Sequence, residues 1–140
     1  MTEIAATEEA MMELGRQCGA QAAPGEVWWL SGNLGAGKTH WTKGFVSGVG
    51  SEAVVTSPTF GLVHEYPGGS APVFHFDFYR IESAEELLGL GWDDYLERDG
   101  IVVVEWGEKY PDLMPESAKQ VTITAQEDGS RQVEISDGSR

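Results

Sequence analysis

The segment WWLSGNLGAGKTH, residues 28–40, joins an apolar run to a glycine-rich loop that ends in lysine and threonine. Within it, residues 32–39 fit the pattern G-x-x-x-x-G-K-[ST] in full. Glycines allow the positive φ angles that turn successive backbone N–H groups toward an anion, and the following helix adds its dipole. The pattern predicts a phosphate-binding loop made of Gly32, Asn33, Leu34, Gly35, Ala36, Gly37, Lys38 and Thr39. In such a loop Lys38 reaches the β and γ phosphates of a nucleotide, and the Thr39 hydroxyl ligates Mg²⁺.

The sequence on both sides of the loop agrees with this interpretation. Residues 26–31 predict a central parallel strand, because they are apolar on both faces. Residues 38–49 predict a helix, since Trp41, Phe45 and Val49 recur at helical spacing. Strand, glycine loop and helix therefore follow one another in the order that phosphate binding requires.

Further elements predict one α/β domain over residues 1–140. An amphipathic helix is expected at 7–22, and a capping box at Ser83 and Glu86 opens a second helix. Strands are expected at residues 61–66, 73–79, 101–105, 120–124 and 132–136, the first two and the last two as antiparallel hairpins. The fold class is a P-loop NTPase-like domain with a mixed parallel/antiparallel central sheet flanked by helices, and we expect the polar tail after about residue 136 to be disordered.

Aromatic and polar side chains alternate in residues 73–79, as on a strand with one buried face. The expected core face carries Phe74, Phe76 and Phe78, and the opposite face carries His75, Asp77 and Tyr79. On this interpretation His75 is a simple surface histidine. A metal-binding role for His75 would need a second nearby imidazole.

A phosphate-binding loop needs a carboxylate at the end of a neighbouring strand to hold the metal ion. Glu105 follows four apolar residues of the 101–105 strand and is the preferred candidate; the alternative is an ordinary acid that leaves a core strand. Asp77 is a second candidate, which a solvated strand face would explain equally well.

Composition limits the classes of function. Nine Lys and Arg against 23 Asp and Glu give a net charge of −14 and a pI of about 4.4. Because no basic face is visible, we expect that the chain does not bind nucleic acid by itself, and another subunit would hold any RNA.

The single cysteine, Cys18, excludes an internal disulfide and favours the cytoplasm. The apolar runs at 27–30 and 101–104 are too short to cross a membrane.

Among nucleotide-binding proteins, two classes fit the sequence less well. The N-K-x-D motif of GTPases is absent, and the five arginines are too scattered for the phosphate clamp of a typical kinase. A stand-alone small-molecule kinase and a nucleotide-sensing interaction module remain alternatives to an ATPase.

Five motifs in order carry a specific resemblance: GNLGAGKT (32–39), SPTF (57–60), HFDFYR (75–80), EELLGLGWDDY (85–95) and VEW (104–106). Together they resemble the bacterial TsaE (YjeE) family over residues 7–136. The resemblance implies a Mg²⁺-dependent ATPase, weak alone, that works with TsaB and TsaD to make threonylcarbamoyladenosine beside the tRNA anticodon. It also implies a cytoplasmic protein that meets tRNA only through the complex, with ATP and Mg²⁺ as its cofactors.

The resemblance assigns roles to single residues. It places Lys38 and Thr39 on the phosphates and Mg²⁺, Glu105 on the metal, and Asp77 in ATP hydrolysis. Thr59 would sense the γ-phosphate.

Other positions follow the family less closely. Glu8 and Arg131 would lie near the adenine, and Trp106 would pack near the site. The chain departs from the common family pattern at Asn33 and His40, which are not phosphate or metal ligands in this scheme.

Overall fold

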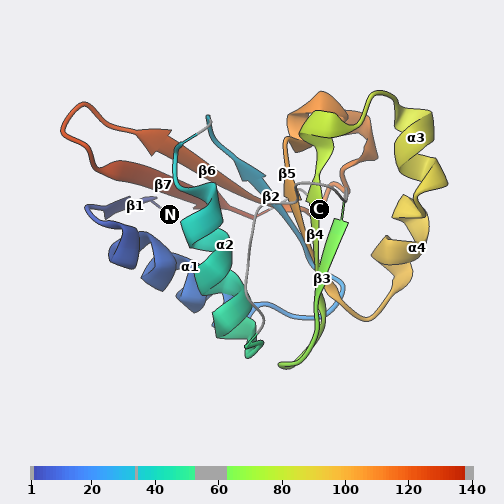
Figure 1. Ribbon diagram of the computed structural model, residues 1–140, viewed down its shortest axis with the longest axis horizontal. Coiled ribbons are helices and arrows are strands. Elements are labelled where there is room, and N and C mark those ends of the chain that lie inside the picture. Colours follow the sequence, from blue (N-terminus) through green and yellow to red (C-terminus); the bar gives the residue numbers. More distant parts are fainter. Residues whose placement is uncertain (1, 34, 53–62, 138–140) are drawn as a thin grey trace.

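The computed structural model describes residues 2–33, 35–52 and 63–137. Its strands form one seven-stranded sheet in the order β1-β7-β6-β2-β5-β4-β3 (Figure 1). The strands are β1 (Thr2–Ala5), β2 (Val27–Ser31), β3 (Val63–Tyr66), β4 (Val73–Asp77), β5 (Ile101–Glu105), β6 (Lys119–Ala125) and β7 (Arg131–Ser136). The central strands β6, β2, β5 and β4 are parallel to their neighbours in this group, and the outer pairs are antiparallel. The predicted mixed α/β sheet is therefore confirmed.

Two long helices lie together against the sheet, at the lower left in Figure 1, below the strands β1, β7 and β6. Helix α1 (Glu8–Gln21) starts at Thr7, whose side chain accepts a hydrogen bond from the Ala10 amide at 3.0 Å. Helix α2 (Lys38–Val49) has the predicted bounds and begins directly after the glycine loop. The helix predicted at 7–22 and the strand predicted at 26–31 are confirmed to within one residue.

The other side of the sheet carries shorter elements. These are α3 (Ala84–Gly89), α4 (Trp92–Glu97) and the 3-10 turns η1 (Phe78–Arg80), η2 (Gly107–Lys109) and η3 (Pro111–Leu113). The Ser83 hydroxyl accepts a hydrogen bond from the Glu86 amide at 3.1 Å, which confirms the predicted start of α3.

Strand β5 divides the core into two clusters because its side chains alternate between the faces of the sheet. Ile101 and Val103 pack with Trp41 and Phe45 of α2, whereas Val102 and Val104 pack with the cluster around Trp92. Glu105 continues this alternation onto the side of α2, and that side also carries the glycine loop.

Two expectations for residues 73–79 were wrong. The strand ends at Asp77, so Tyr79 belongs to η1, and it is 57% exposed. His75 is 1% exposed and is not a surface histidine, because β4 lies between β5 and β3 and is covered on both faces. The structure also contains a strand that the sequence interpretation missed, β1, which pairs antiparallel with β7.

Within the described ranges, no helix combines the length and apolar character needed to cross a membrane. The polar tail that we expect to be disordered begins after about residue 136, and all of it beyond Asp137 lies outside the described residues.

Candidate functional site

The glycine loop, residues 32–37, connects the end of β2 to the start of α2. Gly35 and Gly37 have φ angles of 80° and 109°, which L side chains rarely adopt. Gly37 is the N-cap of α2, so the loop ends at the positive end of the helix dipole. Gly32 approaches β6, where an added Cβ would lie 2.9 Å from the Ile123 carbonyl oxygen. Predicted residues Leu34 and Thr59 lie outside the described residues.

Lys38 is the first residue of α2, and its side chain is buried. Its Nζ lies 3.8 Å from Oε1 of Glu105 and 4.4 Å from the centroid of the Trp106 ring. A carboxylate and an aromatic face therefore hold the ammonium at the base of the loop. The expected packing role of Trp106 agrees with this contact.

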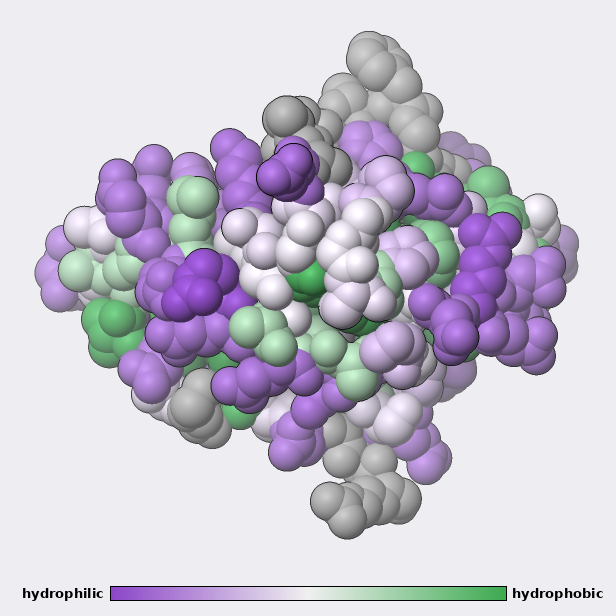
Figure 2. Space-filling model, turned by 90° about the horizontal axis from the view of Figure 1, so that it is seen from below, coloured by the Kyte–Doolittle hydropathy of each residue, from purple (hydrophilic) through white to green (hydrophobic). Residues whose placement is uncertain are grey.

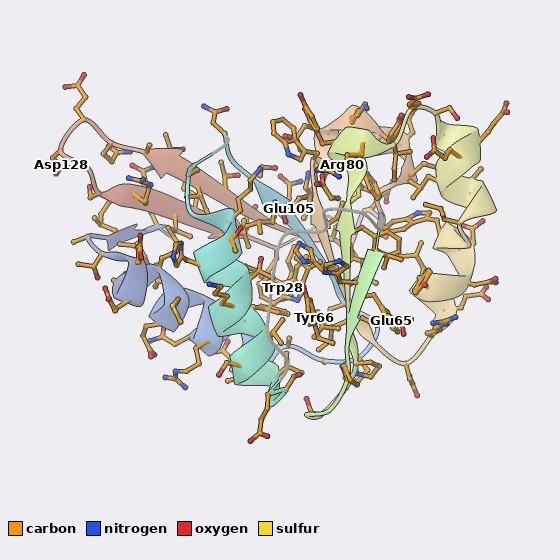
Figure 3. All side chains as sticks on the ribbon, in the orientation of Figure 1. Trp28, Glu65, Tyr66, Arg80, Glu105 and Asp128 are labelled. Carbon is orange, nitrogen blue, oxygen red and sulfur yellow. The ribbon has the colours of Figure 1, made fainter. Side chains whose placement is uncertain are left out.

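Glu105 ends β5 and is 7% exposed. In Figure 3, Glu105 lies where the central strands approach α2. Arg80 lies higher in the same view. Its Oε2 lies 2.6 Å from Nε2 of His75. The sequence interpretation did not connect His75 with Glu105. The signal that could have done so is the position of His75 on the neighbouring strand, two residues before Asp77.

Asp77 lies directly across from Glu105 in the parallel pairing of β4 with β5. Its Oδ1 accepts a hydrogen bond from the Tyr79 amide at 3.0 Å, which caps η1. Burial raises the pKa of Asp77 above its ordinary value, and the charge of Glu105 raises it further, against the lowering effect of the Tyr79 hydrogen bond. Two acids with unlike surroundings therefore stand side by side at the end of the sheet.

The predicted metal ligands are Thr39, in the first turn of α2, and Glu105. Among the described residues, no group of three or more His, Cys, Asp or Glu is arranged to hold a metal ion. A hydroxyl and a carboxylate next to a phosphate-binding loop suit Mg²⁺, which is held by few protein oxygens together with water and substrate phosphates. The donor chemistry of these two residues thus fits the predicted ion.

A pocket of about 290 Å³ lies beside the glycine loop. Its lining comes from the start of the chain, the loop and the end of the chain: Ala5, Ala6, Thr7, Glu8, Met11, Gly35, Gly37, His40, Gly129 and Arg131. The structure therefore brings Glu8 and Arg131 into one pocket, as their predicted common role requires.

Arg131 also supports the glycine loop from the side of β7. Its guanidinium donates hydrogen bonds to the carbonyl oxygens of Ala36 at 3.0 Å and Gly35 at 3.3 Å. On the opposite wall, His40 Nε2 lies 3.2 Å from Glu8 Oε2. Asn33 is exposed, and its carbonyl oxygen accepts a hydrogen bond from the Ala36 amide at 3.0 Å.

A second, more open hollow lies on the far side of Trp106, between η1 and η2. The Tyr79 ring lies 5.1 Å from the Trp106 ring, and Lys109 Nζ donates to the carbonyl oxygens of Tyr79 and Ile81. Arg80 lines the same hollow. Lys109 is a second cation here, which sequence analysis did not connect with the catalytic motif.

The chain resembles known proteins over most of its length. Residues 5–133 match the family described as threonylcarbamoyl adenosine biosynthesis protein TsaE. The tRNA threonylcarbamoyladenosine biosynthesis protein TsaE of Bacillus subtilis is 42% identical over 114 residues, which cover 81% of this chain and 71% of that protein. The protein of the same name from Nostoc sp. is 39% identical over 139 residues, 96% of this chain and 85% of that protein.

A solved structure has the same fold. The crystal structure of YdiB from Bacillus subtilis superposes with a TM-score of 0.86 at 29% identity, and the match covers 99% of this chain and 86% of that one. The motifs in register, the extent of the sequence match and the shared fold together show that the chain belongs to the TsaE family.

Proposed function

We propose that this chain binds and hydrolyses ATP with Mg²⁺, and that it serves threonylcarbamoyladenosine biosynthesis on tRNA together with TsaB and TsaD. One observation carries the proposal: the glycine loop opens α2 with Lys38 at its base, 3.8 Å from the carboxylate of Glu105. The cation for the phosphates then stands at the start of α2, and the acid for the metal stands at the end of β5, the parallel neighbour of β2. The names of the two relatives described above support the biosynthetic role.

The site residues divide the work as follows. Backbone amides of the glycine loop and the ammonium of Lys38 bind the phosphates, and the Thr39 hydroxyl and Glu105 hold the ion. When bound, Mg²⁺ neutralises charge that develops on the transferred phosphoryl group. Asp77 orients the attacking water, since its carboxylate lies opposite Glu105 at the strand end.

The pocket between α1, the loop and the β6–β7 hairpin is the proposed adenine site. Its position next to Gly35 and Gly37 supports this assignment, since a nucleotide whose phosphates occupy the loop extends past these residues. Glu8 and Arg131 line that pocket.

The positions of the cations lead us to propose that the isolated chain hydrolyses ATP slowly. Phosphoryl transfer is accelerated when an added cation, such as an arginine finger, reaches the transition state. Lys38 is buried against Glu105, whereas Arg80 and Lys109 line the neighbouring hollow at the surface. We propose that a partner positions or supplies the missing charge. Because its proposed task is the modification of tRNA, we also propose that the chain acts in the cytoplasm.

A reconstitution tests the proposed function. The chain is mixed with TsaB, TsaD, threonylcarbamoyl-adenylate and tRNA, and modification over many turnovers is measured with and without ATP. We expect dependence on ATP and a loss of roughly 100-fold or more in Lys38→Ala, since a charge placed at the transferred phosphoryl group is worth at least that much.

Lys43→Ala is the matched control, because Lys43 lies exposed on the same helix. Unchanged modification by Lys38→Ala would contradict the proposal. Phosphate transferred to an added acceptor instead of water would favour a small-molecule kinase. An Asp77→Asn variant that binds ATP, fails to hydrolyse it and still supports modification would favour a nucleotide-sensing module.

A further inference from the structure

His75 has a close contact that its place in the middle of β4 does not require. The side chain is 1% exposed, and its Nε2 lies 2.6 Å from Oε2 of Glu105, which is itself buried. The other oxygen of Glu105, Oε1, lies 3.8 Å from Lys38 Nζ. Each carboxylate oxygen therefore has its own partner, one from β4 and one from α2.

The strand register shows what this contact prevents. Glu105 pairs with Asp77, whereas His75 pairs with Val103, one alternation further back along β5. Side chains that stand opposite each other on paired strands are close neighbours. Two carboxylates that the strands hold this close repel each other, and the repulsion favours protonation of one of them. Glu105 instead leans back along the sheet toward His75.

We propose that His75 is a positioning residue that holds Glu105 away from Asp77 and keeps Oε1 directed at the base of the glycine loop. The two acids can then serve separate roles, Glu105 toward the ion and Asp77 toward water. This inference rests on the proposed function, because it assigns His75 a task only if Glu105 serves the metal.

The role of His75 becomes more important when a nucleotide binds, because Glu105 would then lose its contact with Lys38. Once the ammonium turns to the phosphates, the hydrogen bond from His75 is the one side-chain hydrogen bond to Glu105 that the described residues retain. Partners of this kind fix the orientation of metal-binding carboxylates, and their removal typically weakens metal binding 10–100-fold.

The hydrogen bond also specifies the form of the imidazole. An ionised carboxylate only accepts, so Nε2 carries the proton and donates it to Oε2. Nδ1 is buried and has no hydrogen-bond partner among the described residues. A proton on Nδ1 would be a buried N–H group without an acceptor among those residues.

Calorimetry with a nonhydrolysable ATP analogue tests the proposal. The affinity is measured with and without Mg²⁺ for the original protein, His75→Leu, His75→Gln and the control His64→Leu. His64 pairs with His75 across β3 and β4 and contacts Tyr66 instead of Glu105. The strengthening of binding by Mg²⁺ should fall roughly 10-fold or more in His75→Leu, by the loss typical of such partners. It should be largely kept in His75→Gln, whose amide can donate to Glu105, and in the control. Affinity without Mg²⁺ should stay the same in all four proteins.

The outcomes separate this inference from the proposed function. If Mg²⁺ strengthens binding equally in the original protein and in His75→Leu, the role of His75 is wrong and the ATPase proposal stands. If Mg²⁺ does not strengthen binding in the original protein, the metal role of Glu105 is wrong, and the inference falls with it.

A spectroscopic measurement on the metal-free protein does not depend on folding of the His75 variants. Nitrogen NMR of the imidazoles should show a proton on Nε2 of His75, with the Nε2–H signal shifted by Glu105→Gln. Protonation at Nδ1 with a bare Nε2 would overturn the proposal, because no donated hydrogen bond would then hold Glu105.

Discussion

At the level of single residues, the candidate site depends on charges held out of water. Lys38, Glu105 and His75 are all buried, and each finds a partner among the others. Removing one member of such a group leaves an uncompensated polar or charged atom, which costs more than the net value of the contact. Asp77 differs, because it is only half-buried and its described hydrogen bond goes to backbone.

We expect Asp77→Asn to abolish most hydrolysis and leave the fold intact. If the proposed function holds, loss of the carboxylate that orients water in that proposal should slow ATP hydrolysis by roughly 100-fold or more. Because burial raises the pKa of Asp77, its ionisation at neutral pH destabilises the fold. Asparagine carries no charge and can still accept from the Tyr79 amide. Phosphate release and thermal unfolding at several pH values measure both effects.

The pH dependence of the melting temperature of Asp77→Asn tests whether the pKa of Asp77 is raised in the folded protein. The melting temperature of Asp77→Asn should equal or exceed that of the original protein at neutral pH. This advantage should shrink as the pH falls through the raised pKa of folded Asp77 toward 3.8, the ordinary pKa, and should be gone below 3.8, where both folded and unfolded Asp77 are protonated. A lower melting temperature at neutral pH that recovers in acid would contradict the assigned shift.

At the level of elements, the position of the pocket depends on close packing of α1 against α2. Four glycines lie at this contact, and a Cβ on each would stand within about 2 Å of a carbonyl oxygen of the other helix. They are Gly15, Gly19, Gly44 and Gly48. The close approach of the two backbones places the start of α1, with Thr7 and Glu8, beside the glycine loop.

Gly44→Ala should therefore destabilise the protein. The added methyl would lie 1.8 Å from the Met12 carbonyl oxygen, so the helices must separate, at a cost of about 2 kcal/mol or more. Urea unfolding measures the change in free energy. Gly89→Ala is the matched control, since nothing lies within 4 Å of its added Cβ, and we expect a change within about 0.5 kcal/mol. Equal effects of the two changes would show that the helix contact can relax freely.

Elements with strong local signals could be predicted from sequence, and those defined by long-range contacts could not. Helix α2 has the expected bounds because an apolar face and glycines at both ends mark it. Strand β1 was missed, since only Ala5 of its four residues is buried and its one partner, β7, lies at the other end of the sequence. His75 was misjudged because alternation alone cannot tell a solvated face from a second buried one.

The same limit applies to the site. The glycine loop and Glu105 were found from local patterns, whereas the contact between His75 and Glu105 depends on the pairing of β4 with β5. Arg131 was expected near a base, and its hydrogen bonds to the loop carbonyls could be found only in three dimensions.

At the level of the whole molecule, charge is the dominant feature. The net charge is −14 over 140 residues, and Figure 2 shows hydrophilic residues around a paler central area on one face. Such a charge opposes compaction through self-repulsion and repels phosphate backbones. The same charge suits contact with basic surfaces of partner proteins.

We expect salt to stabilise the folded protein. Raising ionic strength from about 0.01 M to about 0.15 M shortens the Debye length from about 30 Å to about 8 Å. The melting temperature in potassium chloride should then rise by a few degrees, because repulsion among exposed acids weakens. A double variant, Glu116→Gln with Glu127→Gln, removes two exposed acids and should respond less. A melting temperature that falls with salt would show that attractive ion pairs dominate instead.

The pairing of β1 with β7 has a consequence for synthesis on the ribosome. The wall of the pocket near Ala5 and the wall near Arg131 come from segments that are far apart in the sequence. A nascent chain that already contains the whole glycine loop still lacks the arginine that braces it and the hairpin that lines the pocket. The pocket should therefore form abruptly, only after β7 has left the exit tunnel.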